Sequence, residues 1–415
     1  MDSKKLHIFF VPFLSPGHMI PMVDMARLFA ARSVTSTIVT TTANAALILP
    51  TITGVDLIHL LTVPFSSSQE NLTAFPTPEL TPSFIESINT LETPVKTLVQ
   101  IHSPDFIISD VFFPWSANLG VPRISFHGSN FFSTILSITT GKLKLHETVS
   151  GDDELFLVPG LPHRIELTRR MLPELLQSNK EFIDEMGEAN RRSFGMVVNS
   201  FYEIEPEYVD MFKGLGSKVW TVGSLSVWNE DTLDKHERGG KANVDVNKCL
   251  AWLDKKKPRS VLYVCFGSLG RFTKTQLEEL AAGLHGSGHP FIWVVREEAS
   301  SVEEHEEEQA MNEKLMVDVL KVGVSVGVKV CSLMKEERTL VKREEIRMAV
   351  EEVMGCGEEV EERRKKAEEL GEMARRAVQE GGSSFQDMDS LMQVMLMEIK
   401  TSSAEVDGDV ANKNK

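Results

Sequence analysis

The first part of the chain alternates almost continuous apolar runs with amphipathic segments. Residues 6–13 (LHIFFVPF) are nearly all apolar, as expected of a strand buried on both faces of a parallel sheet. Residues 19–32 place apolar side chains at three- and four-residue spacing, which predicts a helix. Further strands are predicted at 35–41, 105–109, 121–127 and 195–200, and the strand at 195–200 is expected to be the last of this half. A helix is predicted around 115–119. Strands that alternate with helices indicate parallel βαβ units in a doubly wound sheet.

A polar stretch without periodicity, 229–247, interrupts this pattern and is predicted to be a linker. Strands at 260–266 and 290–295 follow it, together with a weaker apolar run at 324–328 and helices at 274–284, 311–322, 341–354, 360–379 and 385–399. Because a doubly wound domain needs several units of about 30 residues, two clear strands are few, and the second domain is expected to be incomplete. The predicted organisation is a first domain over 1–228, the linker, a truncated domain over 248–385, and a C-terminal helix with a disordered tail over 386–415.

Composition narrows the class of protein. The 415 residues are 42% hydrophobic and carry a net charge of −16, so the protein should repel nucleic acid and anionic membranes. No uninterrupted apolar run reaches the ~18 residues of a membrane span, which argues against stable insertion. The four cysteines form no C-x-x-C pair, so neither a zinc site nor a disulfide framework is expected. We expect a cytoplasmic monomer.

Two ionisable residues follow strands of the predicted sheet at its carboxyl edge, where such sheets bind ligands. His18 follows the first strand and Asp110 follows the strand at 105–109. A neutral imidazole could take a proton from a hydroxyl, and a carboxylate bonded to it would orient the ring. The alternative is that His18 packs at a helix start and Asp110 caps the next helix, and the pattern alone favours this alternative.

A second candidate site is the turn at Gly267 and Ser268, between a strand and a helix. Small residues there allow backbone N–H groups and a hydroxyl to approach a phosphate. The chain contains no G-x-G-x-x-G, no G-x-x-x-x-G-K-[ST] and no H-E-x-x-H motif, which argues against NAD(P), P-loop and zinc-protease chemistry.

Specific segments carry a family likeness that runs from end to end. The chain resembles the plant UDP-dependent glycosyltransferases, which are inverting enzymes with two facing Rossmann-like domains, the GT-B arrangement. The resemblance rests on FFVPFLSPGHMIPMVDMARLFA (9–30), PDFIISDVFFPWS (104–116), GVPRISFHG (120–128), VVNSFYEIEPEY (197–208), SVLYVCFGSL (260–269), GHPFIWVVRE (288–297), EQAMNEKLMVDVLKVGVSVGV (308–328) and AEELGEMARRAVQEGGSSF (367–385). The phrases PWS, VPGLP and SVWNED are most similar to legume triterpenoid saponin glycosyltransferases, such as the soyasapogenol glucuronide galactosyltransferases.

The resemblance implies roles for individual residues. It makes His18 the base that deprotonates the acceptor hydroxyl and Asp110 its partner, in place of the capping alternative. Gly267 and Ser268 correspond to the turn that approaches the donor diphosphate. Glu308 and Gln309 correspond to the last two residues of the donor-binding box, which contact sugar hydroxyls. The implied reaction transfers a hexose from a UDP-sugar to a hydroxyl of a lipophilic plant metabolite, with inversion at the anomeric carbon. The UDP-sugar is a co-substrate, and the resemblance implies neither a metal nor a further cofactor.

The chain departs from the family between residues 296 and 308. The family carries there a W-A-P-Q stretch, whose tryptophan stacks on uracil, and an H-C-G-W-N-S stretch that holds phosphate; this chain contains neither. The alternative reading is therefore a catalytically impaired splice or gene-model variant. Such a chain would act, if at all, as a small-molecule or partner-binding protein.

Overall fold

The computed structural model of the protein describes residues 5–67, 70–71, 86–172, 180–229, 245–267, 272–295, 307–327 and 340–413. The predicted linker lies outside the described residues except at its two ends, where one helix stops at Trp228 and another starts at Val246. The division into domains at 228 and 248 stays a prediction.

The first half is built on a seven-stranded sheet of the order β3-β2-β1-β4-β5-β8-β9. Every neighbouring pair in it is parallel, which confirms the predicted α/β fold class. The prediction that the strand at 195–200 is the last of this half was wrong, because β9 pairs beyond β8. With only three residues, β9 is too short to show a periodicity. The strands are β1 (His7–Val11), β2 (Thr35–Thr41), β3 (Ile58–Val63), β4 (Phe106–Asp110), β5 (Arg123–His127), β8 (Gly195–Val198) and β9 (Val219–Thr221).

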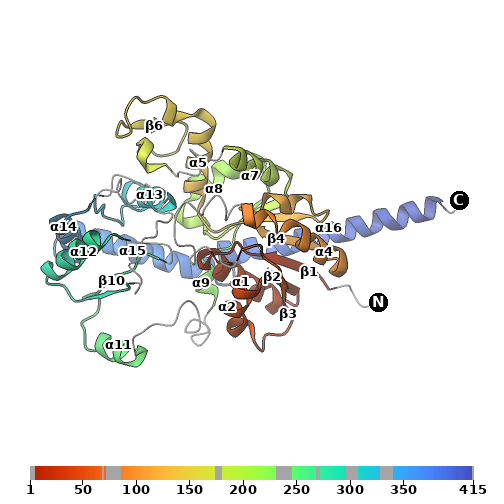
Figure 1. Ribbon diagram of the computed structural model, residues 1–415, viewed down its shortest axis with the longest axis horizontal. Helices are drawn as coiled ribbons and strands as arrows, with labels where there is room; N and C mark the ends of the chain where they lie inside the picture. Colours follow the sequence, from red (N-terminus) through yellow and green to blue (C-terminus); the bar gives the residue numbers. More distant parts are fainter. Residues whose placement is uncertain are drawn as a thin grey trace.

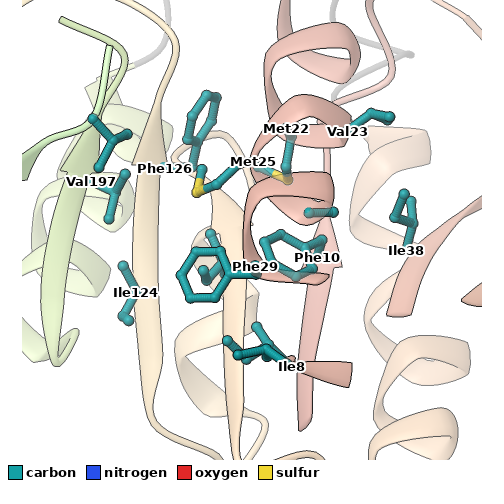
Figure 2. Packing of buried hydrophobic residues seen from close by; sticks show 14 of the residues in the cluster. Ile8, Phe10, Met22, Val23, Met25, Phe29, Ile38, Ile124, Phe126 and Val197 are labelled. Carbon is teal, nitrogen blue, oxygen red and sulfur yellow. The ribbon is translucent and has the colours of Figure 1, made fainter. Parts of the chain in front are cut away.

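Successive side chains of the central strands enter two different cores, since a strand points alternate residues to opposite faces. Ile8 and Phe10 of β1 pack on the face covered by helix α1 (Pro16–Ala31), and Figure 2 shows Met25 and Phe29 of α1 meeting them and the strands beyond. Phe9 and Val11 pack on the opposite face, under helix α4 (Glu92–His102) and the 3-10 turn η3 (Pro114–Asn118), which replaces the helix expected near 115. Burial on both faces explains why these strands read as continuous apolar runs.

The remaining elements of the first half surround the sheet. Some of them, among them α5 and α8, form a third core at its β8–β9 edge, which Met311 and Leu315 of the second half complete. A small antiparallel hairpin, β6 with β7, belongs to this core. These elements are α2 (Thr42–Ile52), α5 (Phe131–Leu143), η4 (Leu145–Glu147), β6 (Phe156–Val158), β7 (Ile165–Leu167), η5 (Arg169–Met171), α7 (Lys180–Arg192), η6 (Tyr202–Ile204), α8 (Pro206–Lys213) and α9 (Leu225–Trp228).

The second half has far less sheet. Its described residues form one parallel pair of strands, β10 with β11, and the apolar run at 324–327 is not a strand. All six residues of this pair are half-buried or exposed, whereas those of β4 and β5 are buried throughout. The elements are α11 (Val246–Leu253), β10 (Leu262–Val264), α12 (Lys274–Gly286), β11 (Phe291–Trp293), α13 (Glu307–Lys314), a π-helical turn η7 (Leu315–Val319), α14 (Arg343–Met354) and α15 (Glu358–Ala377).

The last helix, α16 (Ser383–Lys413), returns to the first half and extends past its sheet toward the C-terminus (Figure 1). Met388, Leu391 and Met395 of α16 complete the core beside α1. The Asp387 carboxylate accepts hydrogen bonds from the amide and hydroxyl of Thr221 in β9, at 2.7 and 2.6 Å. The disordered tail expected after residue 399 is helical to Lys413, since no proline interrupts the segment.

Candidate active site

His18 and Asp110 lie in contact at the carboxyl edge of the first sheet. His18 stands in the first turn of α1 and Asp110 ends β4, which pairs with β1. Nδ1 of His18 is 2.8 Å from Oδ2 of Asp110. The Asp110 side chain is completely buried, while 21% of the His18 side chain is exposed. The pair therefore offers an oriented imidazole whose carboxylate partner is shielded from water.

The imidazole of His18 sits in apolar surroundings. The rings of Phe13 and Phe112 meet it edge-on, with centroid distances of 5.3 and 5.6 Å. The residue after β5 is Gly128, where an added Cβ would lie 3.5 Å from Nδ1 of His18. This close approach of the backbone confines the ring from a third side.

Asp110 is held from two directions besides His18. Its Oδ1 accepts a hydrogen bond from the amide of Phe112 at 3.1 Å, so the carboxylate also caps the turn that follows β4. Its backbone carbonyl accepts a hydrogen bond from Nη2 of Arg123 at 3.2 Å. Burial lowers the pKa of Arg123 to about 10, and the nearby charge of Asp110 opposes that shift. Arg123 was not predicted as a site residue, although a lone cation inside the apolar run VPRISFH is a signal.

A second residue that sequence analysis missed is His127, at the end of β5. It is buried, and burial lowers its pKa to about 4, with Asp110 acting in the opposite direction. His127 is therefore neutral near pH 7. Its Nε2 has no hydrogen-bond partner among the described residues.

The donor-side candidates are described less fully. Gly267, in the turn after β10, adopts a φ of +77°, a left-handed conformation that favours glycine. Ser268 lies outside the described residues. Glu308 and Gln309 lie in the first turns of α13, and their side chains are not among those described.

Helix α13 is joined to the first half close to His18. Oδ1 of Asn312 accepts hydrogen bonds from Nδ2 of Asn130, at 2.8 Å, and from Oγ of Ser133, at 3.1 Å. Asn130 caps α5 and comes two residues after Gly128, the neighbour of the His18 ring. The helix carrying Glu308 and Gln309 is thus anchored beside the loop that borders the imidazole.

In the part of the chain that the structure describes, no group of three or more His, Cys, Asp or Glu residues is arranged to hold a metal ion. Within the described residues, no helix combines the length and apolarity that crossing a bilayer requires.

Comparisons of the sequence and of the structure with known proteins agree on one protein family. No protein-family model matches the chain. The chain is 36% identical to scopoletin glucosyltransferase of Nicotiana tabacum, over 94% of this chain and 98% of that enzyme. It is also 36% identical to anthocyanin 3'-O-beta-glucosyltransferase of Gentiana triflora, with the same coverage.

A solved structure extends the likeness to the fold. UGT73P12 of Glycyrrhiza uralensis, in complex with glycyrrhetinic acid 3-O-monoglucuronide, superposes with a TM-score of 0.88 at 31% identity and covers 99% of this chain and 100% of that one. Relatives of this identity over nearly the full length of both chains share ancestry and fold. The chain belongs to the plant UDP-glycosyltransferases, as the resemblance in its sequence implied.

Proposed function

We propose that this protein transfers a hexose from a UDP-sugar to a hydroxyl group of a lipophilic plant metabolite, with His18 as the general base. The observation that carries the proposal is the 2.8 Å contact between His18 and the buried Asp110. An ionised carboxylate can only accept hydrogen bonds, so Nδ1 of His18 donates and the neutral ring carries its lone pair on Nε2. That nitrogen is the proton acceptor of the reaction.

The proposed step balances without any further reagent. The acceptor O–H bond breaks, its proton goes to Nε2 of His18, and the oxygen forms a bond to the anomeric carbon. The bond between that carbon and the diphosphate oxygen breaks, and UDP leaves with the electron pair. Attack opposite to the leaving group inverts the anomeric centre. Asp110 stabilises the imidazolium that forms.

For the acceptor, we propose a large apolar skeleton of the triterpenoid kind. Phe13 and Phe112 flank the imidazole, and aromatic walls suit an apolar molecule that presents one hydroxyl. UGT73P12, which superposes on almost the whole chain, was solved with a triterpenoid glucuronide, glycyrrhetinic acid 3-O-monoglucuronide. The curated relatives are named for scopoletin and an anthocyanin, which are smaller aromatic acceptors.

We further propose that the donor is held weakly because the second half lacks part of the donor-binding box. The W-A-P-Q and H-C-G-W-N-S stretches are missing from the sequence. The alignment with the tobacco enzyme spans 467 positions, more than the 415 residues of this chain, so the relative has residues with no counterpart here. The half-exposed β10–β11 pair is a third support. Acceptor binding without turnover, the alternative reading of the sequence, is not favoured by the relatives, which are named as glucosyltransferases.

The test is transfer itself. The purified protein is incubated with millimolar UDP-glucose or UDP-galactose and with hydroxylated triterpenoids, scopoletin or an anthocyanidin. Products are detected by mass, and the proton coupling at the anomeric carbon gives the configuration. We expect a hexoside of inverted configuration from the wild type and none from His18→Ala. The control is His59→Ala, an exposed histidine in β3, which should keep the wild-type rate. Transfer that survives in His18→Ala would refute the proposed base.

A further inference from the structure

Arg123 is a fully buried cation directly behind the proposed catalytic pair. It is the first residue of β5 and is only 2% exposed. Its guanidinium donates to four neutral oxygens: Oγ of Ser109 at 2.9 Å, Oγ of Ser193 at 2.8 Å, Oδ1 of Asn190 at 3.2 Å and the backbone carbonyl of Asp110 at 3.2 Å. These bonds fix the position of the guanidinium but do not neutralise its charge.

No carboxylate in the described part of the chain lies within ion-pair distance of Arg123. A buried charge without a counter-charge costs several kcal/mol, so a compensating charge is expected nearby. Asp110 provides it, because its carboxylate is the negative group that acts on Arg123 from the same strand pair. Asp110 thus has two partners: its carboxylate contacts Nδ1 of His18, and its backbone carbonyl accepts a hydrogen bond from Nη2 of Arg123.

We propose that Arg123 is a positioning residue that offsets the charge of Asp110, so that Asp110 remains an ionised acceptor for Nδ1 of His18 while His18 remains neutral. The role rests on the proposed function, in which a neutral His18 receives the acceptor proton. With the cation present, the Asp110–Arg123 pair has little net charge and His18 is not driven to bind a proton. Without it, the whole negative charge of Asp110 acts on His18 and favours the imidazolium, which cannot act as a base.

The other titratable groups around this pair do not replace Arg123. His127, at the far end of β5, is neutral near pH 7 because burial lowers its pKa to about 4. Arg192, at the end of α7, is exposed; it donates to Asn118 and lies 3.8 Å from the Glu188 carboxylate. Solvent and this neighbour weaken its field.

The experiment is an NMR titration of the His18 ring in the full chain, without substrate. The Cε1–H signal of His18 is assigned by its loss in His18→Gln. In Arg123→Met, the titration midpoint of His18 should move to higher pH by about one pH unit. In Arg123→Lys, which keeps a positive charge at the site, the midpoint should stay near the wild-type position.

A second pair of variants covers the case in which Arg123→Met does not fold. Asn190→Asp places a carboxylate against Nη1 of Arg123 without changing the size of the side chain, and neutralises the cation in place. Its matched control is Asn118→Asp, which adds the same charge beside Arg192 instead. We expect an upward shift in Asn190→Asp and a much smaller one in Asn118→Asp.

Two results would overturn the proposal: equal midpoints in Arg123→Met and Arg123→Lys, or equal midpoints in Asn190→Asp and Asn118→Asp. A merely structural role for Arg123 predicts the first of these, with loss of stability but no change in the midpoint. Because the titration needs neither donor nor acceptor, it gives its result whether or not the transfer assay succeeds. Failure of the positioning role and failure of the proposed function are therefore separate outcomes.

Discussion

The two halves of this molecule are packed very differently. In the first half, the residues of β4 and β5 are buried throughout, and three cores surround one seven-stranded sheet. In the second half, the two described strands are at best half-buried, and Tyr263 of β10 is 65% exposed. The proposed base belongs entirely to the well-packed half. In the proposed mechanism, acceptor activation and donor binding therefore use separate sheets, so a loss in the second need not affect the first.

The largest expected effect comes from removing the charge of Asp110 in the packed half. In Asp110→Asn, the amide can donate to Nδ1 of His18, which places the ring proton on Nε2 and removes the base. We expect kcat/KM for transfer to fall by about 10²–10⁴-fold. The control is Asp105→Asn, just before the same strand, whose carboxylate accepts from the His7 amide. Equal losses in both variants would place the effect in folding, not in chemistry.

The packing contrast itself can be measured by truncating one phenylalanine in each sheet. Phe10→Ala in β1 removes a completely buried ring and should lower the free energy of unfolding by about 3–5 kcal/mol. Phe291→Ala in β11 removes a half-buried ring and should cost about 1 kcal/mol. Urea titration, with hydrogen exchange of peptides covering β1 and β11, reports each half separately. Similar costs at the two sites would show that the halves are equally well packed.

Between about pH 6.5 and about pH 4.5, the first half should lose stability as the pH falls because of one buried histidine, His127. The pKa of His127 is about 6.5 when unfolded and about 4 when folded, so between these values the unfolded chain binds a proton that the folded chain does not. Stability therefore falls as the pH drops from about 6.5 to about 4, by about 3 kcal/mol from this group.

The variant His127→Gln should lose that part of the pH dependence, and His59→Gln, at an exposed position, should retain it. Glu205, whose pKa burial raises, contributes with the opposite sign in all three proteins and cancels in the comparison. Urea midpoints at pH 7 and pH 5 measure the difference. An unchanged slope in His127→Gln would mean that this histidine takes up its proton without unfolding.

The smallest predicted effect concerns the attachment of α16 to the first sheet. Asp387→Ala removes two hydrogen bonds to Thr221 and should cost about 1–2 kcal/mol. Asp389→Ala, two residues on, breaks a looser ion pair with Arg32, 3.6 Å long, and should cost less than about 1 kcal/mol. Thermal melting ranks the two variants. The reverse order would show that α16 is held by its apolar contacts and that these polar bonds add nothing.

The sequence predicts the first half well because its central strands are buried on both faces. Phe9 and Phe10 enter opposite cores, so no polar residue interrupts the run that marks the strand. The same parallel order brings the carboxyl ends of β1 and β4 together, which is why His18 and Asp110 could be placed at the same edge of the sheet in advance, while their pairing came from the family resemblance. The capping alternative is also met in part, since Asp110 accepts from the amide of Phe112 while it contacts His18.

What the sequence could not provide depends on partners that are distant along the chain. Arg123 becomes informative only when Asn190 and Ser193 are seen around its guanidinium. β9 is three residues long, and its place in the sheet follows from β8 and from α16, which lies more than 160 residues further on. The local periodicity of a sequence does not depend on such contacts and cannot predict them. The family likeness supplied the role of His18, which spacing alone did not favour.

The most direct test of the proposal that the second half binds the donor weakly is a calorimetric titration of the wild-type protein with UDP. If the second half lacks part of its donor-binding box, UDP should bind with a dissociation constant of about 1 mM or weaker, and the His18→Ala variant should behave identically because His18 belongs to the other half. A dissociation constant in the micromolar range would contradict this account, since it would require a complete donor site in the half whose two described strands are half-buried or exposed.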